Sequence, residues 1–347
     1  MDQNVQSEKP ATTLLSSIVS ALACRVTARS RSIHMNTFGT FANTRRWEAE
    51  TPRTLLVKSG QVPVRDGRVC YAQTAPDGSE GLEAVTFAGR AQAMSAAGMS
   101  EEAMQAALGG QVSWTAPRSL LQMVQLIPET EDEVTAVCSA VSLLQWHLEN
   151  KFSSVDGSPT EIADGGKKRL RGGSSLHPRV DPVAIVLCVS ADGMKCLLGR
   201  QKRYPPGMYT CVSGFVEHAE SVEAAAAREV AEETSVVCAE VTLVGSQPWP
   251  IGRGGHCELM LGCTARAKRG GEAIDCTGDG QEGTGELEDA RWFSRAEAVA
   301  MLDASTKPLS GSGGAAPQLR TPPPIAIAHH LVRRWAHATQ PEASSSL

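Results

Sequence analysis

The sequence predicts an α/β protein of the α+β kind, with more than one domain. The chain has 347 residues, 41% of them hydrophobic, which is enough for two hydrophobic cores. Residues 183–199 hold two apolar runs around an Asp-Gly turn, the pattern of a β-hairpin. Residues 221–234 combine a capping serine with a run of alanines, the pattern of a helix.

Composition excludes several classes of function. The net charge is -5, with 33 basic against 38 acidic residues, so the chain lacks the general basic surface of a protein that binds nucleic acid or anionic membranes. The ten cysteines include no C-x-x-C pair, which favours reduced thiols inside a cell. No apolar run approaches the roughly 20 residues that cross a bilayer. We therefore expect an intracellular protein with no membrane partner.

The two ends of the chain predict segments outside the folded domains. Residues 1–34 are rich in Ser, Thr and Ala, with late arginines, and are expected to be a disordered leader or a weak mitochondrial presequence. Residues 339–347, which end in Ser345-Ser346-Leu347, are expected to be a flexible tail. This ending resembles a peroxisomal tripeptide but lacks the basic middle residue. The expected location is the cytoplasm, with mitochondria and peroxisomes as alternatives.

A smaller mixed N-terminal domain is expected at residues 35–150. Its residues 37–119 mix short apolar runs with Gly, Pro and Asp, which predicts short strands and hairpins, including a turn at Asp66-Gly67. Thr130 and Glu133 form a capping-box pattern ahead of a helix. The apolar residues that follow at helical spacing are Val134, Val137, Val141, Leu144 and Leu148. Residues 151–180 are rich in Gly, Ser and basic residues, and are interpreted as a linker or small irregular module.

A second domain is expected at residues 181–338, and its helix at residues 221–234 carries three clustered acids. At about 100° of rotation per residue, Glu229, Glu232 and Glu233 project within a sector of roughly 100°. A solvated acidic helix face is the ordinary explanation of such a cluster. Carboxylates at this spacing also suit Mg²⁺ or Mn²⁺, which bridge protein oxygens to substrate phosphates. Residues 268–285 and 310–324 are Gly-, Ser- and Pro-rich and are expected to be surface loops.

The residues around these acids decide between the two explanations. Residues 214–236 resemble the Nudix box, G-x5-E-x7-R-E-U-x-E-E-x-G-U. If each of six matched residues occurs by chance at about one position in fifteen, the probability that all six match at a given starting position is on the order of 10⁻⁷. One position departs, because Ser235 stands where the box has its second glycine and a left-handed turn is needed. The matching residues are Gly214, Glu220, Arg228, Glu229, Val230, Glu232, Glu233 and Val236.

The resemblance implies the Nudix fold, a mixed β-sheet sandwiched between helices, and a metal-dependent hydrolase that activates water for attack on a pyrophosphate. It implies Glu229, Glu232 and Glu233 as metal ligands. Arg228 would orient a box carboxylate, and Glu220 would support the loop or the outer metal shell. The glutamate that acts as general base varies across the superfamily and is left open.

A second resemblance is to the NADH pyrophosphatases, whose signature S-Q-P-W-P-F-P-x-S is matched by Ser246-Gln247-Pro248-Trp249-Pro250. Residues 198–201, 205–209, 259–262, 286–293 and 322–329 also resemble this family. The resemblance implies a dinucleotide pocket lined by Gln247, Pro248, Trp249 and Pro250, with Phe215 stacking on a base. It implies backbone contacts from Ser213 and Ala328, and Glu286 as a further metal ligand. A core Phe215 and a solvated Glu286 are the plain alternatives.

Two departures from that family change what is expected. Ile251-Gly252 replaces Phe-Pro, and extra residues precede Leu259, so one side of the pocket is expected to be reshaped. Ser153 and Asp156 occupy the positions of the first cysteine pair of the family's zinc ribbon. No Cys pair appears between Lys167 and Arg179, so a structural zinc is not expected.

The expected function is metal-dependent hydrolysis of NADH or NAD⁺ to nicotinamide mononucleotide and AMP, with Mg²⁺ or Mn²⁺. The alternatives are a Nudix hydrolase acting on ADP-ribose or NAD-capped RNA, and a catalytically silent dinucleotide-binding protein. RNA would enter only as a capped end, because the chain is acidic. The family's paired N-terminal domains imply a homodimer.

Overall fold

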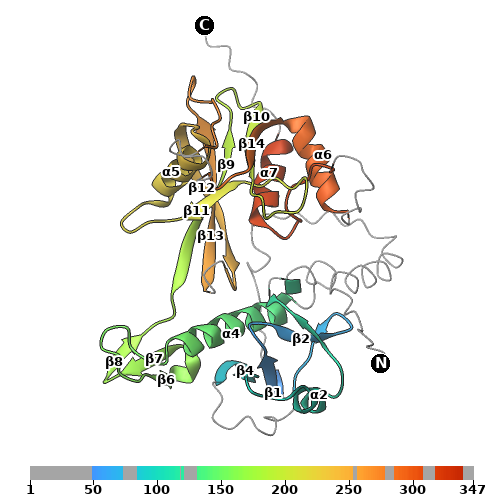
Figure 1. The fold of residues 1–347 in the computed structure, drawn as a ribbon, viewed down its shortest axis with the longest axis vertical. Helices are drawn as coiled ribbons and strands as arrows, with labels where there is room; N and C mark the ends of the chain where they lie inside the picture. Colours follow the sequence, from blue (N-terminus) through green and yellow to red (C-terminus); the bar gives the residue numbers. More distant parts are fainter. Residues whose placement is uncertain are drawn as a thin grey trace, which may run out of the picture. The chain divides into compact units, whose positions relative to one another are not determined.

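The computed structural model describes residues 49–72, 84–117, 119–120, 131–252, 256–277, 285–307 and 317–338 (Figure 1). The leader expected at residues 1–34 and the tail expected at residues 339–347 lie outside these ranges. Within them, no helix combines the length and the apolar character needed to cross a membrane.

The C-terminal part is built on one mixed sheet. Its hydrogen-bonded order is β12-β13-β9-β10-β14, and β11 also pairs with β9. β13 runs parallel to β9, whereas the other neighbours are antiparallel. β9 and β10 form the predicted hairpin, with Gly193 at φ 76° in its turn. The strands are β9 (Val180–Val189), β10 (Lys195–Arg200), β11 (Val212–Phe215), β12 (Cys238–Trp249), β13 (Cys257–Ala267) and β14 (Asp289–Ser294).

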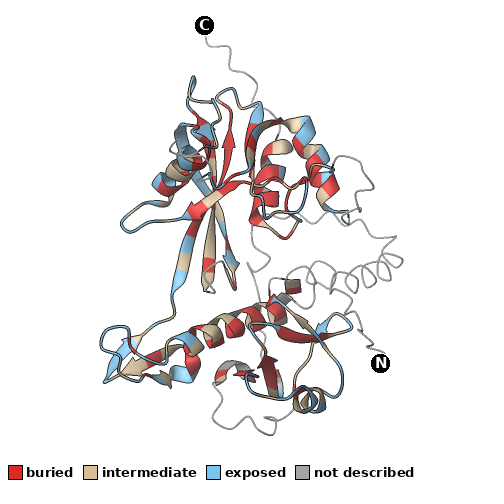
Figure 2. Cartoon of the chain, in the orientation of Figure 1, coloured by how far each residue is buried: buried red, intermediate tan, exposed pale blue. Residues whose placement is uncertain are grey.

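Helices cover both faces of this sheet, as Figure 1 shows. Successive strand residues point to opposite faces, so the buried run of β9 feeds two cores. Its even-numbered residues 184–188 pack with α5 (Val222–Thr234). Its odd-numbered residues 185–189 pack with α6 (Arg295–Ser305) and α7 (Ile327–Ala336). The predicted sheet sandwiched between helices is confirmed, and Figure 2 shows buried residues along the strands and on the helix sides that meet them.

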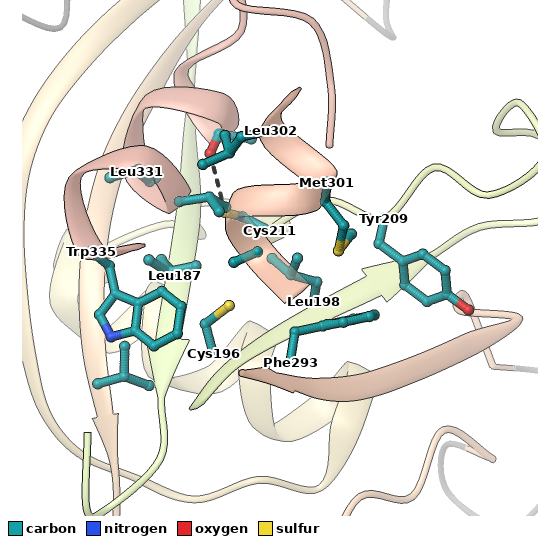
Figure 3. Close-up of a cluster of buried hydrophobic side chains, with 14 of the residues drawn as sticks. Leu187, Cys196, Leu198, Tyr209, Cys211, Phe293, Met301, Leu302, Leu331 and Trp335 are labelled. Carbon is teal, nitrogen blue, oxygen red and sulfur yellow. Dashed lines mark hydrogen bonds between the residues drawn. The ribbon is translucent and has the colours of Figure 1, made fainter. Parts of the chain in front are cut away.

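The core under α6 and α7 contains two cysteines among large apolar side chains (Figure 3). Tyr209 and Phe293 meet edge to face, with ring centroids 5.2 Å apart. Burial raises the pKa of the Cys196 thiol to about 12, so this thiol is un-ionised at neutral pH. Every described cysteine is a free thiol. The cysteines of this core therefore act as small apolar residues.

The N-terminal part contains the predicted long helix and a set of short strands. The helix α4 (Glu131–Glu149) buries Val134, Val137, Val141 and Leu144 against β1 and β4, which confirms the helical spacing. Asp66 and Gly67 form the predicted turn, with φ of 51° and 73°. The other elements here are β1 (Ala49–Val57), β2 (Val62–Arg65), β3 (Arg68–Val69), β4 (Ala84–Ser95), α2 (Glu101–Ala107) and β5 (Ser113–Thr115).

Two features of this part differ from the predicted strands and hairpins. β1 and β4 pair in parallel, which a hairpin does not allow, because a parallel pair needs a crossover connection. α2 is a helix whose N-terminus is capped by the Ser100 hydroxyl, which accepts a hydrogen bond from the Ala103 N–H. The short length of α2 gave too few turns for periodicity to reveal it.

Residues 153–175, interpreted from composition as a linker or irregular module, form a small ordered sheet. β6 (Glu161–Ala163), β7 (Lys168–Arg171) and β8 (Ser174–Leu176) pair in antiparallel order, and a 3-10 turn, η2 (Asp164–Gly166), joins the first two. Arg169 is only 3% exposed, and it donates hydrogen bonds to Thr160 Oγ1 at 2.6 Å and to the Thr160 carbonyl at 2.9 Å. Polar side chains thus order a segment whose composition resembles that of a linker.

The ends of α5 agree with the local sequence. The Ser221 hydroxyl accepts a hydrogen bond from the Ala224 N–H at 3.2 Å, as expected for the first capping residue. At the other end, Ser235 has φ 61° and ψ 3°, the left-handed conformation that the box glycine would adopt. The Ser235 N–H donates to the Ala231 carbonyl at 2.8 Å. The helix ends at the predicted residue, with a serine in a glycine conformation.

Replacing Ser235 by glycine should stabilise the protein. A left-handed backbone conformation costs a residue with a Cβ about 1–2 kcal/mol, and glycine avoids this cost. The greater conformational freedom of glycine in the unfolded chain cancels part of the stabilisation. We expect Ser235→Gly to raise the free energy of unfolding by about 0.5–1 kcal/mol in urea titrations. Ser221→Gly is the control, because Ser221 has φ -80° and gives glycine no advantage. A lower unfolding free energy for Ser235→Gly than for the wild type contradicts the prediction.

Candidate active site

Arg228 is the centre of the acidic cluster on α5. Its guanidinium donates to both carboxylate oxygens of Glu220, at 2.9 Å each, in a two-pronged ion pair. It also donates to Glu229 Oε1 at 2.8 Å and to Glu232 Oε2 at 2.9 Å. A further hydrogen bond at 2.9 Å reaches the Phe215 carbonyl on β11. Arg228 therefore ties the helix to the loop before it and to the sheet.

The electrostatics of the cluster follow from these bonds. The hydrogen bonds from Arg228, and then the Glu217 N–H, hold the pKa of the Glu220 carboxyl below its usual value. Hydrogen bonding to Glu220 in turn raises the pKa of Arg228. Glu229 behaves differently, because burial raises the pKa of its carboxyl despite the bond to Arg228, and the charges of Glu232 and Glu286 add to the rise. The charged form of Glu229 is thus disfavoured by its burial and by the neighbouring acids.

Gly214 makes room for the Glu229 carboxylate. A Cβ on Gly214 would lie 1.9 Å from the carboxyl carbon of Glu229 and 2.0 Å from each of its oxygens. The Glu229 side chain is 12% exposed, so it lies against the backbone of β11. The first glycine of the box therefore has a steric role that the sequence pattern alone did not define.

The other predicted metal ligands differ in how far their side chains are exposed to solvent. Glu232 is 58% exposed in its side chain, Glu233 is buried at 8%, and Glu286 is exposed. Within the described ranges, no group of three or more His, Cys, Asp or Glu side chains is arranged to hold a metal ion. The donor chemistry still fits Mg²⁺ or Mn²⁺, because carboxylate oxygens gather around a single guanidinium and are the ligands these ions prefer.

A cavity of about 600 Å³ is lined by residues of β11, β12 and β13 and of the segment before α7. Ser213 lines the cavity, and the next residue along β11 is Gly214, which contacts the Glu229 carboxylate. Trp249 and Tyr204 supply aromatic side chains, and most of the other lining residues are apolar. The cavity thus offers an aromatic and apolar surface for a planar base, and it is linked to the box through the consecutive residues Ser213 and Gly214.

The Ser-Gln-Pro-Trp-Pro segment divides between two faces. Gln247 and Trp249 line the cavity of about 600 Å³, whereas Pro248 and Pro250 line a separate cavity of about 270 Å³. The cause is strand alternation along β12, which sends neighbouring residues to opposite faces. Gln247 is also tied to the 325–327 segment: its amide donates to the Ile325 carbonyl at 2.8 Å and accepts from the Ile327 N–H at 2.9 Å. It holds one wall of the cavity in place.

The other predicted contact residues lie close by. Ser213 and Ala328 both line the cavity, and the Ala328 carbonyl accepts a weak hydrogen bond from the Cys211 thiol at 3.9 Å. Phe215 is 42% exposed at the end of β11 and is not among the described residues that line the cavity. Its exposure excludes the alternative of a core phenylalanine.

Several lining residues were not predicted from the sequence. Met208 lies in residues 205–209, which resemble the NADH pyrophosphatases, so the sequence pointed to this segment but gave Met208 no role. Ile185 and Met260 lie on β9 and β13 and could not be told from ordinary core residues. Glu258 is 4% exposed on β13, and no motif pointed to it. The sheet register brings these residues together.

Comparisons with known proteins find a NUDIX domain in the part of the chain that carries this site. The model of the NUDIX domain matches residues 179–310. The chain is 41% identical over 223 residues to the NAD-capped RNA hydrolase NUDT12 of Homo sapiens, covering 61% of this chain and 44% of that protein. It is 34% identical over 250 residues to the NAD(P)H pyrophosphatase NUDT13, mitochondrial, of Mus musculus, covering 70% of this chain and 64% of that protein.

A bacterial relative shows the same likeness. The chain is 36% identical over 207 residues to the NAD-capped RNA hydrolase NudC of Mycobacterium bovis (strain BCG / Pasteur 1173P2), covering 58% of this chain and 59% of that protein. The chain spans 44 to 64% of the length of these three curated relatives. With the box acids on α5 and a mixed sheet between helices, the chain carries a Nudix domain, and it is similar to NAD-capped RNA hydrolases and to an NAD(P)H pyrophosphatase.

Proposed function

We propose that this protein hydrolyses the central pyrophosphate bond of NADH or NAD⁺, giving nicotinamide mononucleotide and AMP, with Mg²⁺ or Mn²⁺. One observation carries the proposal: Ser213 of β11 lines a largely apolar cavity that also contains Trp249, and the next residue, Gly214, lies against the Glu229 carboxylate. A dinucleotide joins two planar bases through a charged pyrophosphate, so it needs an apolar surface and a cation site side by side.

The box residues would have different roles in the reaction. Glu229, Glu232, Glu233 and Glu286 would hold the divalent cation, which when bound supplies charge neutralisation to the pyrophosphate and lowers the pKa of water. A carboxylate of the cluster takes the proton as the water oxygen bonds to phosphorus and the bridging P–O bond breaks. Arg228 would position Glu229 and Glu232 through the hydrogen bonds it already donates, and Glu220 would fix Arg228.

The test is hydrolysis of four substrates. The protein is incubated with Mg²⁺ or Mn²⁺ and NADH, NAD⁺, ADP-ribose or an NAD-capped RNA oligonucleotide, and the products are separated by chromatography. We expect equal amounts of AMP and reduced nicotinamide mononucleotide from NADH. Binding of NADH without cleavage would overturn the proposal in favour of a silent dinucleotide-binding protein.

NAD-capped RNA is the second candidate substrate, and the names of two relatives favour it. The aromatic and apolar lining of the cavity suits a terminal base, whereas the net charge of -5 disfavours a long RNA. Cleavage of the capped oligonucleotide with a kcat/KM above that for NADH would make the cap the preferred substrate.

The assembly and the location of the protein are also proposals. We propose a homodimer, tested by light scattering coupled to size-exclusion chromatography, in which a mass of one chain would contradict it. We propose the cytoplasm as the location. Fluorescent fusions at either end would test the N-terminal leader and the C-terminal tripeptide, since a fusion masks whichever signal it covers.

A further inference from the structure

The module formed by residues 151–176 holds four positions that the proposed reaction does not use. Positions 153 and 156 lie in the loop before β6, and positions 171 and 174 lie on the two sides of the β7–β8 turn. Each pair has two residues between its members, which is the arrangement of a zinc ribbon, C-x2-C followed by a second C-x2-C. The residues present are Ser153, Asp156, Arg171 and Ser174. The loop and the hairpin must therefore be held together without four thiolates.

The loop at residues 153–158 is a tight turn that its own polar groups hold in shape. The Ser153 N–H donates to the Ser158 carbonyl at 2.8 Å, and the Gly157 N–H donates to the Ser153 carbonyl at 2.9 Å. Asp156 Oδ1 accepts from the Ser158 N–H at 3.1 Å and from the Ser158 hydroxyl at 2.7 Å. Gly157 has φ 72°, the left-handed conformation that glycine adopts at low cost. The turn thus fixes the places of positions 153 and 156.

Arg171 lies between this turn and the hairpin. Its guanidinium donates to Ser153 Oγ at 3.2 Å and lies 3.7 Å from Asp156 Oδ2. Arg171 and Ser174 are cross-strand partners at the end of the β7–β8 hairpin, so their side chains share one face of it. Three of the four positions therefore meet at one point, and the fourth lies on the same face of the hairpin as Arg171.

These four residues do not fit a zinc ion. Serine is not a normal zinc ligand, and the Ser153 hydroxyl oxygen already accepts hydrogen bonds from the Val155 N–H, at 3.1 Å, and from Arg171. The guanidinium of Arg171 cannot lose its proton, so it offers no lone pair and repels a metal cation. Asp156 is the only carboxylate of the four, whereas a structural zinc site needs four ligands. The chemistry of these donors therefore excludes zinc.

A second arginine makes the same kind of connection deeper in the module. Arg169 is 3% exposed, and besides its two hydrogen bonds to Thr160 it donates to the His147 carbonyl of α4 at 3.3 Å. Arg169 and Arg171 are two residues apart on β7, so their side chains point to the same face of that strand. The face of β7 that meets residues 153–160 is thus basic, with Arg169 buried and Arg171 nearer the surface.

We propose that Arg171 replaces the metal of a zinc ribbon with a cation that belongs to the chain itself. Its guanidinium binds the loop through Ser153 and Asp156 and is covalently part of the hairpin, so it makes the connection that a zinc ion makes between two pairs of ligands. This connection uses neither a metal nor a thiolate. The module should therefore be insensitive to chelators, and its stability should depend on the charge of one side chain.

Metal analysis and thermal unfolding test this role. The purified protein should contain no stoichiometric zinc and should keep its Tm in EDTA. Arg171→Met keeps much of the length of the side chain but removes its charge and its donors, so it should lower the Tm by about 2–4 °C. Arg179→Ala is the control, because Arg179 is 63% exposed and pairs with Asp181 outside the module. One zinc per wild-type chain, or a wild-type Tm for Arg171→Met, overturns the proposal.

A double-mutant cycle tests whether the charge of Arg171 is what matters. Asp156→Asn removes the negative charge, and its amide oxygen can still accept the two hydrogen bonds from Ser158. The Tm loss of the double variant should be smaller than the sum of the two single losses, because each single change already breaks the same ion pair. Strictly additive losses overturn the proposal, since Arg171 would then act by packing alone.

Cysteines at the four positions test the geometry. The variant with S153C, D156C, R171C and S174C together should bind one Co²⁺ with a tetrahedral thiolate spectrum, and zinc should raise its Tm. The wild type, which has all ten native cysteines, is the matched control and should show neither effect. A folded fourfold variant that binds no cobalt overturns the proposal, because the four positions would then not converge. If the fourfold variant does not fold, the Tm of Arg171→Met and the double-mutant cycle decide the question.

Discussion

Glu232→Gln should lower the kcat for NADH hydrolysis by about 10²- to 10³-fold while leaving the Tm nearly unchanged. The neutral amide cannot supply the negative oxygen that a divalent cation needs, so the cation is lost or misplaced at the pyrophosphate. Folding should be little affected, because the Glu232 side chain is 58% exposed and its ion pair with Arg228 lies at the surface. Steady-state kinetics at saturating Mg²⁺ and thermal unfolding measure the two effects.

The control for Glu232→Gln is Glu240→Gln, which removes an equally exposed carboxylate from β12. We expect it to retain wild-type kinetics. If Glu232→Gln also kept the wild-type kcat, the assignment of the box acids as metal ligands would be wrong.

Gly214→Ala is expected to lower kcat by about 10²-fold, although glycine has no side chain that could take part in the reaction. The new methyl would fall 1.9 Å from the Glu229 carboxyl carbon, so the Glu229 side chain must swing away from β11 and from Arg228. A displacement of about 1 Å in a positioned group is enough for an effect of that size. KM should change less, because the cavity-lining residues keep their places. Kinetics with NADH across a range of Mg²⁺ concentrations give the measurement, and more Mg²⁺ should be needed for half-maximal rate.

The matched control is Gly271→Ala, where the new methyl would meet Val237 Cβ at 3.1 Å, away from every box carboxylate. It tests whether an alanine in place of a tightly packed glycine reduces activity in general. Equal kcat for Gly214→Ala and the wild type would show that Glu229 does not need its position against β11. Loss of stability without loss of kcat would assign Gly214 a packing role only.

Local interactions made several elements predictable from the sequence. The Ser221 cap, the alanine run and the box residues define α5 because helix ends and helix propensity depend on residues a few positions apart. The β9–β10 hairpin is equally local, since Asp192-Gly193 supplies the turn between two apolar runs. The identity of the acids is also sequence information, because the spacing of Glu229, Glu232 and Glu233 gives their positions on the helix.

Tertiary structure decided what the acids contact and what lies next to them. The place of the Glu229 carboxylate against Gly214, and the split of Gln247 and Trp249 from Pro248 and Pro250, depend on strand register between distant segments. The same holds for the sheet at residues 161–176, where buried Arg169 satisfies partners that composition does not reveal. The sequence by itself determined the chemistry of the Nudix box. Only the pairing of β12 with β13 and the packing of the sheet placed Glu258 in the cavity, because side-chain contacts across a sheet have no local signature.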